Sequence, residues 1–254
     1  MNVVVLVKYV PNPTGTPTMG DDFCLKREGE EGALDPGDEP GVEAALQLTE
    51  QAGGEVTVVS MGPESAVAAV RRALSMGAHK AVMVTDDVLK GSDVLITARV
   101  LAAAIKRLEF DLVIAGVEST DGYTGTLPMA VAELLGVPGA TFARRLELED
   151  GTIVIERQTE TGYDTVQCPL PALVTVTAGV NEPRYPTLKG IMQAKQKPME
   201  KLAVADLGLS ADDVKPTQEV IGVEDVPERE AGDVVDEAGE APGRIVEFLA
   251  KAKV

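Results

Sequence analysis

The stretch Asp111-Leu-Val-Ile-Ala-Gly116-Val-Glu-Ser-Thr-Asp121-Gly-Tyr-Thr-Gly-Thr126-Leu-Pro128 decides the fold of this chain. An aliphatic run ends at Gly116, passes through a loop of glycines and hydroxyls, and leads into an apolar helical pattern over Met129–Leu135. A buried strand that opens into such a loop and a helix N-terminus is suited to anions, because the first N–H groups of a helix have no partner within it. In open α/β sheets, ligands bind beyond the carboxyl ends of the strands, so we expect a nucleotide here.

Strands and helices alternate over residues 1–140. Aliphatic runs predict strands at Val3–Val10, Glu55–Met61, Ala81–Thr85 and Asp111–Ala115. Apolar residues at helical spacing predict helices at Glu39–Glu50, Pro63–Met76, Ser92–Leu108 and Leu127–Leu135. Pro63 fits the first helical position, Ser92 an N-cap and Gly77 a C-terminal cap. This alternation indicates an α/β fold with a mainly parallel sheet.

The pattern changes after residue 140. Leu146–Arg157 is typical of two strands around an Asp150-Gly turn, and further strands follow at Thr165–Leu170 and Ala172–Thr177. We expect an antiparallel hairpin extension over residues 141–180 within an α/β domain of residues 1–205. Residues 206–254 are acidic and poor in aliphatic residues, so we expect an extended C-terminal arm that is disordered or wrapped on a partner, with an amphipathic end at Arg244–Ala250.

Composition excludes several classes of protein. The formal net charge of −18 argues against a nucleic-acid partner and against binding to an anionic membrane surface. Apolar runs are too short to insert into a membrane, and the two cysteines lie far apart without metal spacing. We expect a reduced, soluble, cytoplasmic protein.

The chain offers little catalytic chemistry. It has one histidine, His79, and lacks the Gly-x-Gly-x-x-Gly, P-loop and Gly-x-Ser-x-Gly motifs. No nucleophile stands beside a base in the candidate segments, so we predict no catalytic residue and no metal site, and binding without turnover.

Two segments are candidates for a nucleotide site. In the loop after Gly116, Gly122 and Gly125 let backbone N–H groups approach a phosphate, Thr124 and Thr126 offer hydroxyls, and Asp121 orients the loop or contacts a sugar. The same composition also suits an ordinary strand-to-helix turn. The turn Asp35–Asp38 begins the next helix pattern; it either places acids in a favourable first turn or faces the same ligand.

Several motifs run through the chain in order. They are Val5-Leu-Val-Lys8-Tyr-Val10, Asp35-Pro36 followed by Val42-Glu43-Ala-Ala-Leu46, Arg72-Ala-Leu-Ser-Met-Gly77-Ala78, the stretch at Asp111–Asp121, Pro171-Ala-Leu-Val-Thr-Val176, and Asn181-Glu-Pro-Arg-Tyr185-Pro-Thr-Leu-Lys-Gly-Ile-Met192-Gln-Ala-Lys195. Together they resemble the β subunit of electron transfer flavoproteins, and the last motif looks like that family's signature.

The resemblance implies a Rossmann-like fold of the adenine-nucleotide α-hydrolase-like kind. It implies a heterodimer whose α subunit holds most of an FAD and is contacted by the arm at 206–254, while this chain binds a structural AMP. Electrons come from acyl-CoA dehydrogenases of fatty acid β-oxidation, or from other dehydrogenases, and leave toward a quinone oxidoreductase. By the same resemblance, the cofactor contacts fall on Leu6, Asp35, Pro36, Gly37, Asp38, Met61, Gly116, Asp121, Gly122, Tyr123, Thr124, Gly125, Thr126 and Leu127.

The family's recognition segment maps onto residues 181–197. Leu188 is the apolar anchor, and the other partner-docking residues are Arg184, Tyr185, Lys189, Ile191, Met192 and Lys195. An exposed leucine among Arg184, Lys189, Lys195 and Lys197 suits a transient partner, since rim charges speed encounter and a central anchor supplies specificity. A helix with solvated lysines is the alternative.

The nucleotide loop departs from the family pattern. Gly125 and Thr126 stand where many members carry Asn and Gln, and Asp35 stands where Asn is common. Electron-bifurcating relatives bind a second FAD in this pocket and share the Asp-Gly and the Thr of this loop. AMP and a second FAD therefore both remain open. A nucleotide-hydrolysing or nucleotide-activating α/β enzyme is the alternative from another class, although Lys8-Tyr-Val-Pro-Asn-Pro13 replaces the phosphate loop such enzymes need.

Overall fold

The computed structural model describes residues 1–12, 14–15, 18–27, 31–224, 226–227, 232, 234–235 and 239–252. The chain forms two compact units, Met1–Ile221 and Gly222–Val254. The first unit includes residues 206–221, which the sequence analysis assigned to the arm. Its helices are α1 (Glu39–Ala52), α2 (Val67–Met76), α3 (Val94–Ile105), α4 (Leu127–Leu135) and α5 (Leu188–Ala194), with 3₁₀ turns at Glu64–Ala66, Asp87–Leu89, Val204–Leu207 and Asp212–Val214.

A nine-stranded sheet in the order β11-β5-β4-β1-β6-β10-β7-β8-β9 forms the centre of the first unit. Its strands are β1 (Asn2–Leu6), β4 (Glu55–Met61), β5 (Lys80–Val84), β6 (Leu112–Gly116), β7 (Gly139–Glu149), β8 (Thr152–Thr159), β9 (Gly162–Pro169), β10 (Ala172–Val176) and β11 (Met199–Leu202). Strands from β11 to β7 are parallel, and β7, β8 and β9 are antiparallel. The predicted α/β fold, a mainly parallel sheet with an antiparallel extension, is confirmed.

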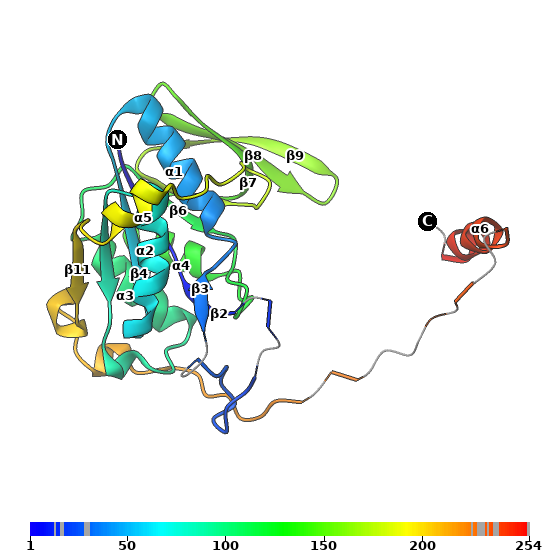
Figure 1. Ribbon diagram of the computed structural model, residues 1–254, viewed down its shortest axis with the longest axis horizontal. Coiled ribbons are helices and arrows are strands. Elements are labelled where there is room, and N and C mark those ends of the chain that lie inside the picture. The colour runs from blue at the N-terminus through cyan, green and yellow to red at the C-terminus, as the bar shows by residue number, and fades with distance from the viewer. Residues whose placement is uncertain are drawn as a thin grey trace. The chain divides into compact units, whose positions relative to one another are not determined.

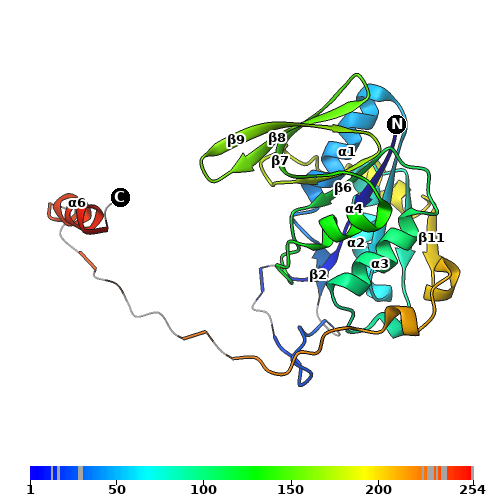
Figure 2. The same ribbon diagram turned by 180° about the vertical axis from the view of Figure 1, so that it is seen from behind.

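Helices cover both faces of the sheet. Residues of α1 and α2 belong to one apolar cluster, and residues of α3 and α4 belong to the other, so the two pairs lie on opposite faces (Figures 1 and 2). Both clusters are almost wholly aliphatic. All four Phe and all four Tyr lie within the described part of the chain, and none of them is buried there. Burial on both faces explains why the parallel strands are continuous runs of Val, Ile, Leu and Ala.

Three predicted boundaries are corrected. The strand predicted at Val3–Val10 ends at Leu6. The chain leaves the sheet there, because the N–H of Lys8 donates to the carboxylate of Asp38 and not to a neighbouring strand. The chain then forms a separate two-stranded hairpin of β2 (Tyr9–Pro11) and β3 (Gly32–Leu34). The N-cap of α3 is Asp93 and not Ser92, since the Asp93 carboxylate accepts the N–H of Ile96.

The helix predicted at Pro63–Met76 begins as a 3₁₀ turn with Pro63 as its N-cap, and α2 itself starts at Val67. The predicted C-terminal cap at Gly77 is confirmed.

The antiparallel extension is confirmed for β7, β8 and β9 but not for the strand at Ala172–Thr177. Asp150 and Gly151 both have positive φ, as a two-residue type I′ turn between β7 and β8 requires. The strand β10, by contrast, lies between β6 and β7 and is parallel to both. Its five residues are all buried, as is typical of a strand covered on both faces.

The second unit contains the helix α6 (Ala241–Ala252), none of whose residues is buried. Ile245, Val246, Phe248 and Leu249 are exposed on it, which fits the predicted amphipathic end of the arm. No helix in the described ranges is long and apolar enough to cross a membrane.

Candidate functional site

Strands β1 and β6 are neighbours at the point where the connections of the sheet change direction. The chain leaves β1 through α1 on one face, and it leaves β6 through α4 on the other. This is the topological switch point of an open α/β sheet, where ligands bind beyond the carboxyl ends of the strands. Of the predicted cofactor residues, Leu6, Met61 and Gly116 end or nearly end β1, β4 and β6 at this edge.

The turn Asp35–Asp38 is braced against both strands at the switch point. The buried carboxylate of Asp38 accepts the N–H of Lys8, just beyond β1, at 2.7 Å. The buried carboxylate of Asp35 accepts the N–H of Gly37 at 2.9 Å and, after β6, the N–H of Thr120 at 2.7 Å. The two predicted contact acids therefore direct their oxygens at protein donors and fix the geometry of the site.

A glycine is required at the end of β6. A Cβ on Gly116 would stand 2.9 Å from Oδ1 of Asp38 and 3.0 Å from the carbonyl oxygen of Gly37. A Cβ this close to a buried carboxylate and a backbone carbonyl would force the turn to shift, so the missing side chain of Gly116 lets the turn lie against the end of β6. This spacing accounts for the glycine in the stretch that decides the fold.

The carboxyl group of Asp38 has a raised pKa. Burial, reinforced by the neighbouring carboxylate of Asp35, raises the pKa of Asp38 well above its ordinary value, although the N–H groups of Lys8 and Gly116 oppose the shift. Groups with strongly shifted pKa values cluster at functional sites, so the shift makes this end of the sheet a candidate site.

The nucleotide loop, residues 116–127, is held by a charged cluster. Only 4% of the Asp121 side chain is exposed, and its carboxylate pairs with Nζ of Lys8 at 2.7 Å and with Nη1 of Arg27 at 2.5 Å. Burial by itself would raise the pKa of Asp121, but Lys8 and Arg27 outweigh it and hold this pKa below its ordinary value. The two ion pairs of Asp121 thus tie the loop to Lys8 and Arg27.

Sequence reasoning missed Lys8 and Arg27. Lys8 fell inside the strand predicted at Val3–Val10, and only the observed end of β1 at Leu6 places it at the same edge as the end of β6. Arg27 gave no signal, since it lies in a segment where no element was predicted.

The part of the loop from Gly122 to Thr126 is open to solvent. Gly122, Tyr123, Thr124, Gly125 and Thr126 are exposed, and Leu127 is partly buried where α4 begins. Tyr123 and Gly125 have positive φ, and the side chain of Thr126 does not cap α4. Pro36 is exposed as well, beside the buried acids. The loop therefore presents backbone and hydroxyl groups around the N-terminus of α4. The first N–H groups of α4 are not capped by the side chain of Thr126 and can face a ligand.

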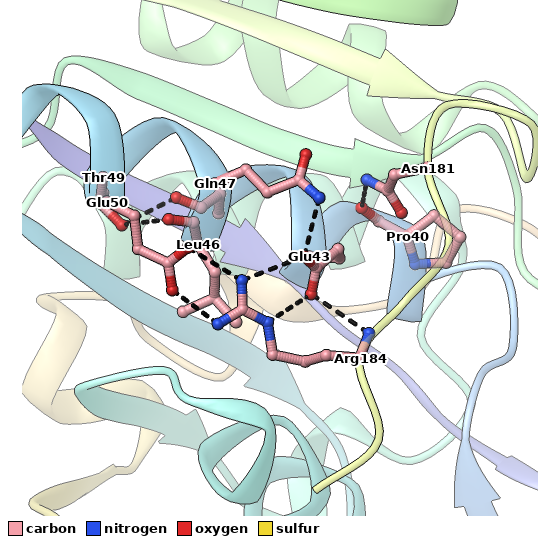
Figure 3. Close-up of polar contacts among 9 residues, drawn as sticks. Pro40, Glu43, Leu46, Gln47, Thr49, Glu50, Asn181 and Arg184 are labelled. Carbon is pink, nitrogen blue, oxygen red and sulfur yellow. Dashed lines mark hydrogen bonds and ion pairs between the residues drawn. The ribbon is translucent and has the colours of Figure 1, made fainter.

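The recognition segment, residues 181–197, lies on α1 and α2. Two residues anchor it on α1 (Figure 3). Arg184 donates from Nε to Oε2 of Glu43 at 2.7 Å and from Nη1 to Glu50 at 2.6 Å. Asn181 donates to the carbonyl of Pro40 at 3.0 Å. The expectation of Arg184 as an open rim charge is corrected, because its guanidinium is occupied within the chain.

A second set of contacts holds the segment on α2. Lys197 Nζ donates to the carbonyls of Leu74 and Ala78 at the end of α2, and burial lowers the pKa of Lys197, so it is not an open rim charge either. Arg71 of α2 donates to the carbonyl of Ala194 at 2.8 Å.

The outward side of the segment is apolar with lysines beside it. Tyr185 is 88% exposed, Leu188 76% and Met192 66%, while Ile191, Lys189 and Lys195 are exposed as well. Leu188, Ile191 and Met192 share one face of α5 because they stand three and four residues apart. The structure thus brings together the predicted apolar anchor and two of its four predicted rim charges.

The chain matches a known family over most of its length. A profile of the electron transfer flavoprotein domain matches residues 22–207. Electron transfer flavoprotein subunit beta of Mycobacterium tuberculosis H37Rv is 42% identical, over an alignment that covers 100% of this chain and 99% of that protein. The chain belongs to the electron transfer flavoprotein β-subunit family.

Other members of the family are nearly as similar. Electron transfer flavoprotein subunit beta of Bacillus subtilis strain 168 is 38% identical over the whole of both chains. The caffeyl-CoA reductase–Etf complex subunit CarD of Acetobacterium woodii is 35% identical, over 86% of each chain. The resemblance recognised in the sequence is confirmed, and electron transfer within a flavoprotein is the function that the family name carries.

Proposed function

We propose that this electron transfer flavoprotein β subunit binds a structural AMP at the switch point, pairs with an α subunit that holds most of an FAD, and docks the dehydrogenase that delivers electrons. The observation that carries the proposal is the convergence of the turn Asp35–Asp38 and the nucleotide loop on the ends of β1 and β6. Folds of this kind bind ligands at such a point.

The residues at the switch point suit a phosphate. The exposed hydroxyls of Thr124 and Thr126 flank the N-terminus of α4, which carries the positive end of the helix dipole. Gly125 at positive φ lets the backbone approach a ligand closely. Asp35 and Asp38 turn their oxygens toward N–H groups of the chain, so their contribution is to hold the loop in place.

The redox chemistry belongs to the flavin, which accepts and donates electrons when bound. This chain positions its nucleotide, supports the α subunit and presents the recognition segment, and we propose no catalytic residue in it. The exposed apolar residues Ile245, Val246, Phe248 and Leu249 of α6 suit a contact with the α subunit, because a helix without a core of its own needs an apolar partner.

The recognition segment is the proposed docking site for an acyl-CoA or other dehydrogenase, and electrons leave toward a quinone oxidoreductase. The test is Leu188→Ala in the complete two-subunit flavoprotein, with Leu134→Ala as a control, because Leu134 is an exposed leucine on α4. We expect slower reduction by the dehydrogenase for Leu188→Ala with unchanged flavin content, and no effect of the control. Equal rates for both variants would place the dehydrogenase contact elsewhere.

A second FAD in place of AMP is the alternative, and the similarity to CarD, a subunit of a reductase–Etf complex, keeps it in view. Acid extraction of the purified complex followed by nucleotide analysis separates the two. One AMP per FAD supports the proposal, and two FAD with no AMP supports the alternative. One FAD with no other nucleotide would overturn nucleotide binding at the switch point.

A further inference from the structure

The recognition segment carries an arginine, Arg184, whose side chain lies against α1. Arg184 leaves 35% of its side chain exposed, and its main acceptor, Glu43, leaves 5% exposed. Its neighbour Tyr185 is 88% exposed. The charge of Arg184 is thus directed at α1, while the next side chain is directed at solvent.

The guanidinium of Arg184 makes four hydrogen bonds to two carboxylates of α1. Nε and Nη2 donate to the two oxygens of Glu43 at 2.7 and 3.0 Å, and Nη1 and Nη2 donate to the two oxygens of Glu50 at 2.6 and 3.1 Å. The backbone N–H of Arg184 also donates to Glu43, at 3.2 Å. Glu43 and Glu50 stand seven residues apart on one side of α1, so the planar fork spans two helical turns (Figure 3).

Electrostatics agree with this geometry. The hydrogen bonds with Glu50 and Glu43 raise the pKa of Arg184, and those from Arg184 lower the pKa of Glu50. Burial would raise the pKa of Glu43, but its hydrogen bonds with Arg184 and Gln47 outweigh burial and lower it. A lysine cannot reproduce this arrangement, because an ammonium lacks the rigid bidentate fork.

We propose that Arg184 is a positioning residue: it clamps the recognition segment to α1 and thereby fixes the direction in which Tyr185 and Leu188 meet the partner. The inference rests on the proposed docking function of the segment. It assigns Arg184 a role different from the one proposed for the exposed Lys189 and Lys195, which is to attract the partner by long-range charge.

The first test measures order in the segment and needs no dehydrogenase. Hydrogen exchange is followed in the complete two-subunit flavoprotein for Arg184→Gln, Arg184→Lys and the control Lys195→Gln. Loss of charge-assisted hydrogen bonds should speed exchange of residues 185–194 by about tenfold to a hundredfold in Arg184→Gln, with partial recovery in Arg184→Lys. The remainder of the chain and the control should exchange as the parent does. Unchanged exchange at 185–194, or faster exchange everywhere, would overturn the proposal.

The second test separates positioning from charge steering. The KM for the flavoprotein in reduction by its dehydrogenase should rise in Arg184→Gln with kcat nearly unchanged, and the rise should persist at about 0.5 M salt, where exposed charges are screened. The effect of Lys195→Gln should fade at that salt concentration. An Arg184→Gln effect that fades in parallel would show that Arg184 steers and does not position.

Two controls keep the outcomes distinct. Should Arg184→Gln fail to fold, Glu50→Gln removes only the exposed half of the clamp, since the Glu50 side chain is 57% exposed, and a smaller, still local increase in exchange is expected. A fully parental exchange pattern in Glu50→Gln would then count against the clamp. Should Leu188→Ala leave reduction unchanged, the docking function fails, while the exchange data still decide whether Arg184 orders the segment.

Discussion

Replacing Asp121 by Asn should lower the free energy of unfolding at neutral pH. This difference from the parent protein should become smaller in acid. The Asp121 carboxylate is almost fully buried between Lys8 at 2.7 Å and Arg27 at 2.5 Å. The Lys8 contact is a hydrogen bond between charged groups, which contributes roughly 1.5–3 kcal/mol, and the Arg27 contact adds an ion pair. However, the Lys8 and Arg27 side chains are 39% and 35% exposed, so solvent screens both pairs. With the opposing desolvation of the carboxylate, we expect a net loss of about 1–2 kcal/mol in the free energy of unfolding.

The pH dependence follows from the lowered pKa of this carboxyl group. In the folded protein, burial is outweighed by Lys8 and Arg27, so the pKa of Asp121 lies below the value of about 3.9 that applies to the unfolded chain. Its stabilisation is therefore complete above that value and is lost as the pH falls through the folded-state pKa. The stability difference between the parent and Asp121→Asn should be full at pH 7 and shrink in the most acidic conditions the complex tolerates.

The assay is urea unfolding of the complete flavoprotein at one fixed concentration, at pH 7 and in steps toward pH 3, with nucleotide content determined on the same samples. Glu133→Gln, which alters an exposed carboxylate on α4, is the control and should match the parent throughout. A stability difference that stays constant as the pH falls would refute the ion-pair reasoning. Loss of nucleotide without loss of stability would instead mean that Asp121 touches the ligand.

Three further predictions concern close contacts and the second unit. Gly116→Ala should lower the nucleotide content of the purified complex, because the new methyl group would stand 2.9 Å from the carboxylate of Asp38; retention of full nucleotide content would contradict this. Gly190→Ala should reduce the free energy of unfolding by about 1–3 kcal/mol, as overpacking does, and raise the KM for the dehydrogenase, since its Cβ would meet the carbonyl of Ser75 at 2.5 Å. An unchanged melting temperature and KM would show that α5 shifts freely on α2. Removing residues 222–254 should leave the first unit folded by circular dichroism but weaken its association with the α subunit in size-exclusion chromatography; unaltered association would rule out α6 as a contact.

Much of the fold was predictable because its strands are buried on both faces. Such strands are continuous aliphatic runs, so β4, β5 and β6 were located to within a residue or two of their observed bounds. The position of β10 was not predictable from local pattern. It follows an antiparallel hairpin in the sequence, and only the pairing with β6 and β7 shows that the chain returns to the parallel part of the sheet.

The candidate site was predictable as a set of loops but not as a network of contacts. Strand order brings Gly116 and the turn Asp35–Asp38 to one edge, and the rule for open α/β sheets anticipates that much. Partners far apart in sequence, such as Arg27 with Asp121 and Arg184 with Glu43, depend on tertiary packing that no local periodicity encodes. For this reason the sequence alone suggested Arg184 as an exposed cation at the rim of the docking site, whereas in the structure it pairs with Glu43 of α1.

The route of residues 177–198 has a consequence for how partner preference can change. The chain leaves the sheet at β10, near its middle, and returns at β11, its outermost parallel strand, after passing over α1 and α2. The segment that we propose as the dehydrogenase docking site is thus part of the same stretch of chain that places β11 beside β5. Arg184 and Lys197 hold this stretch against α1 and α2, whereas Tyr185, Leu188 and Met192 are exposed. On the proposed docking function, partner preference can therefore be changed at these exposed side chains while the contacts with α1 and α2 are kept.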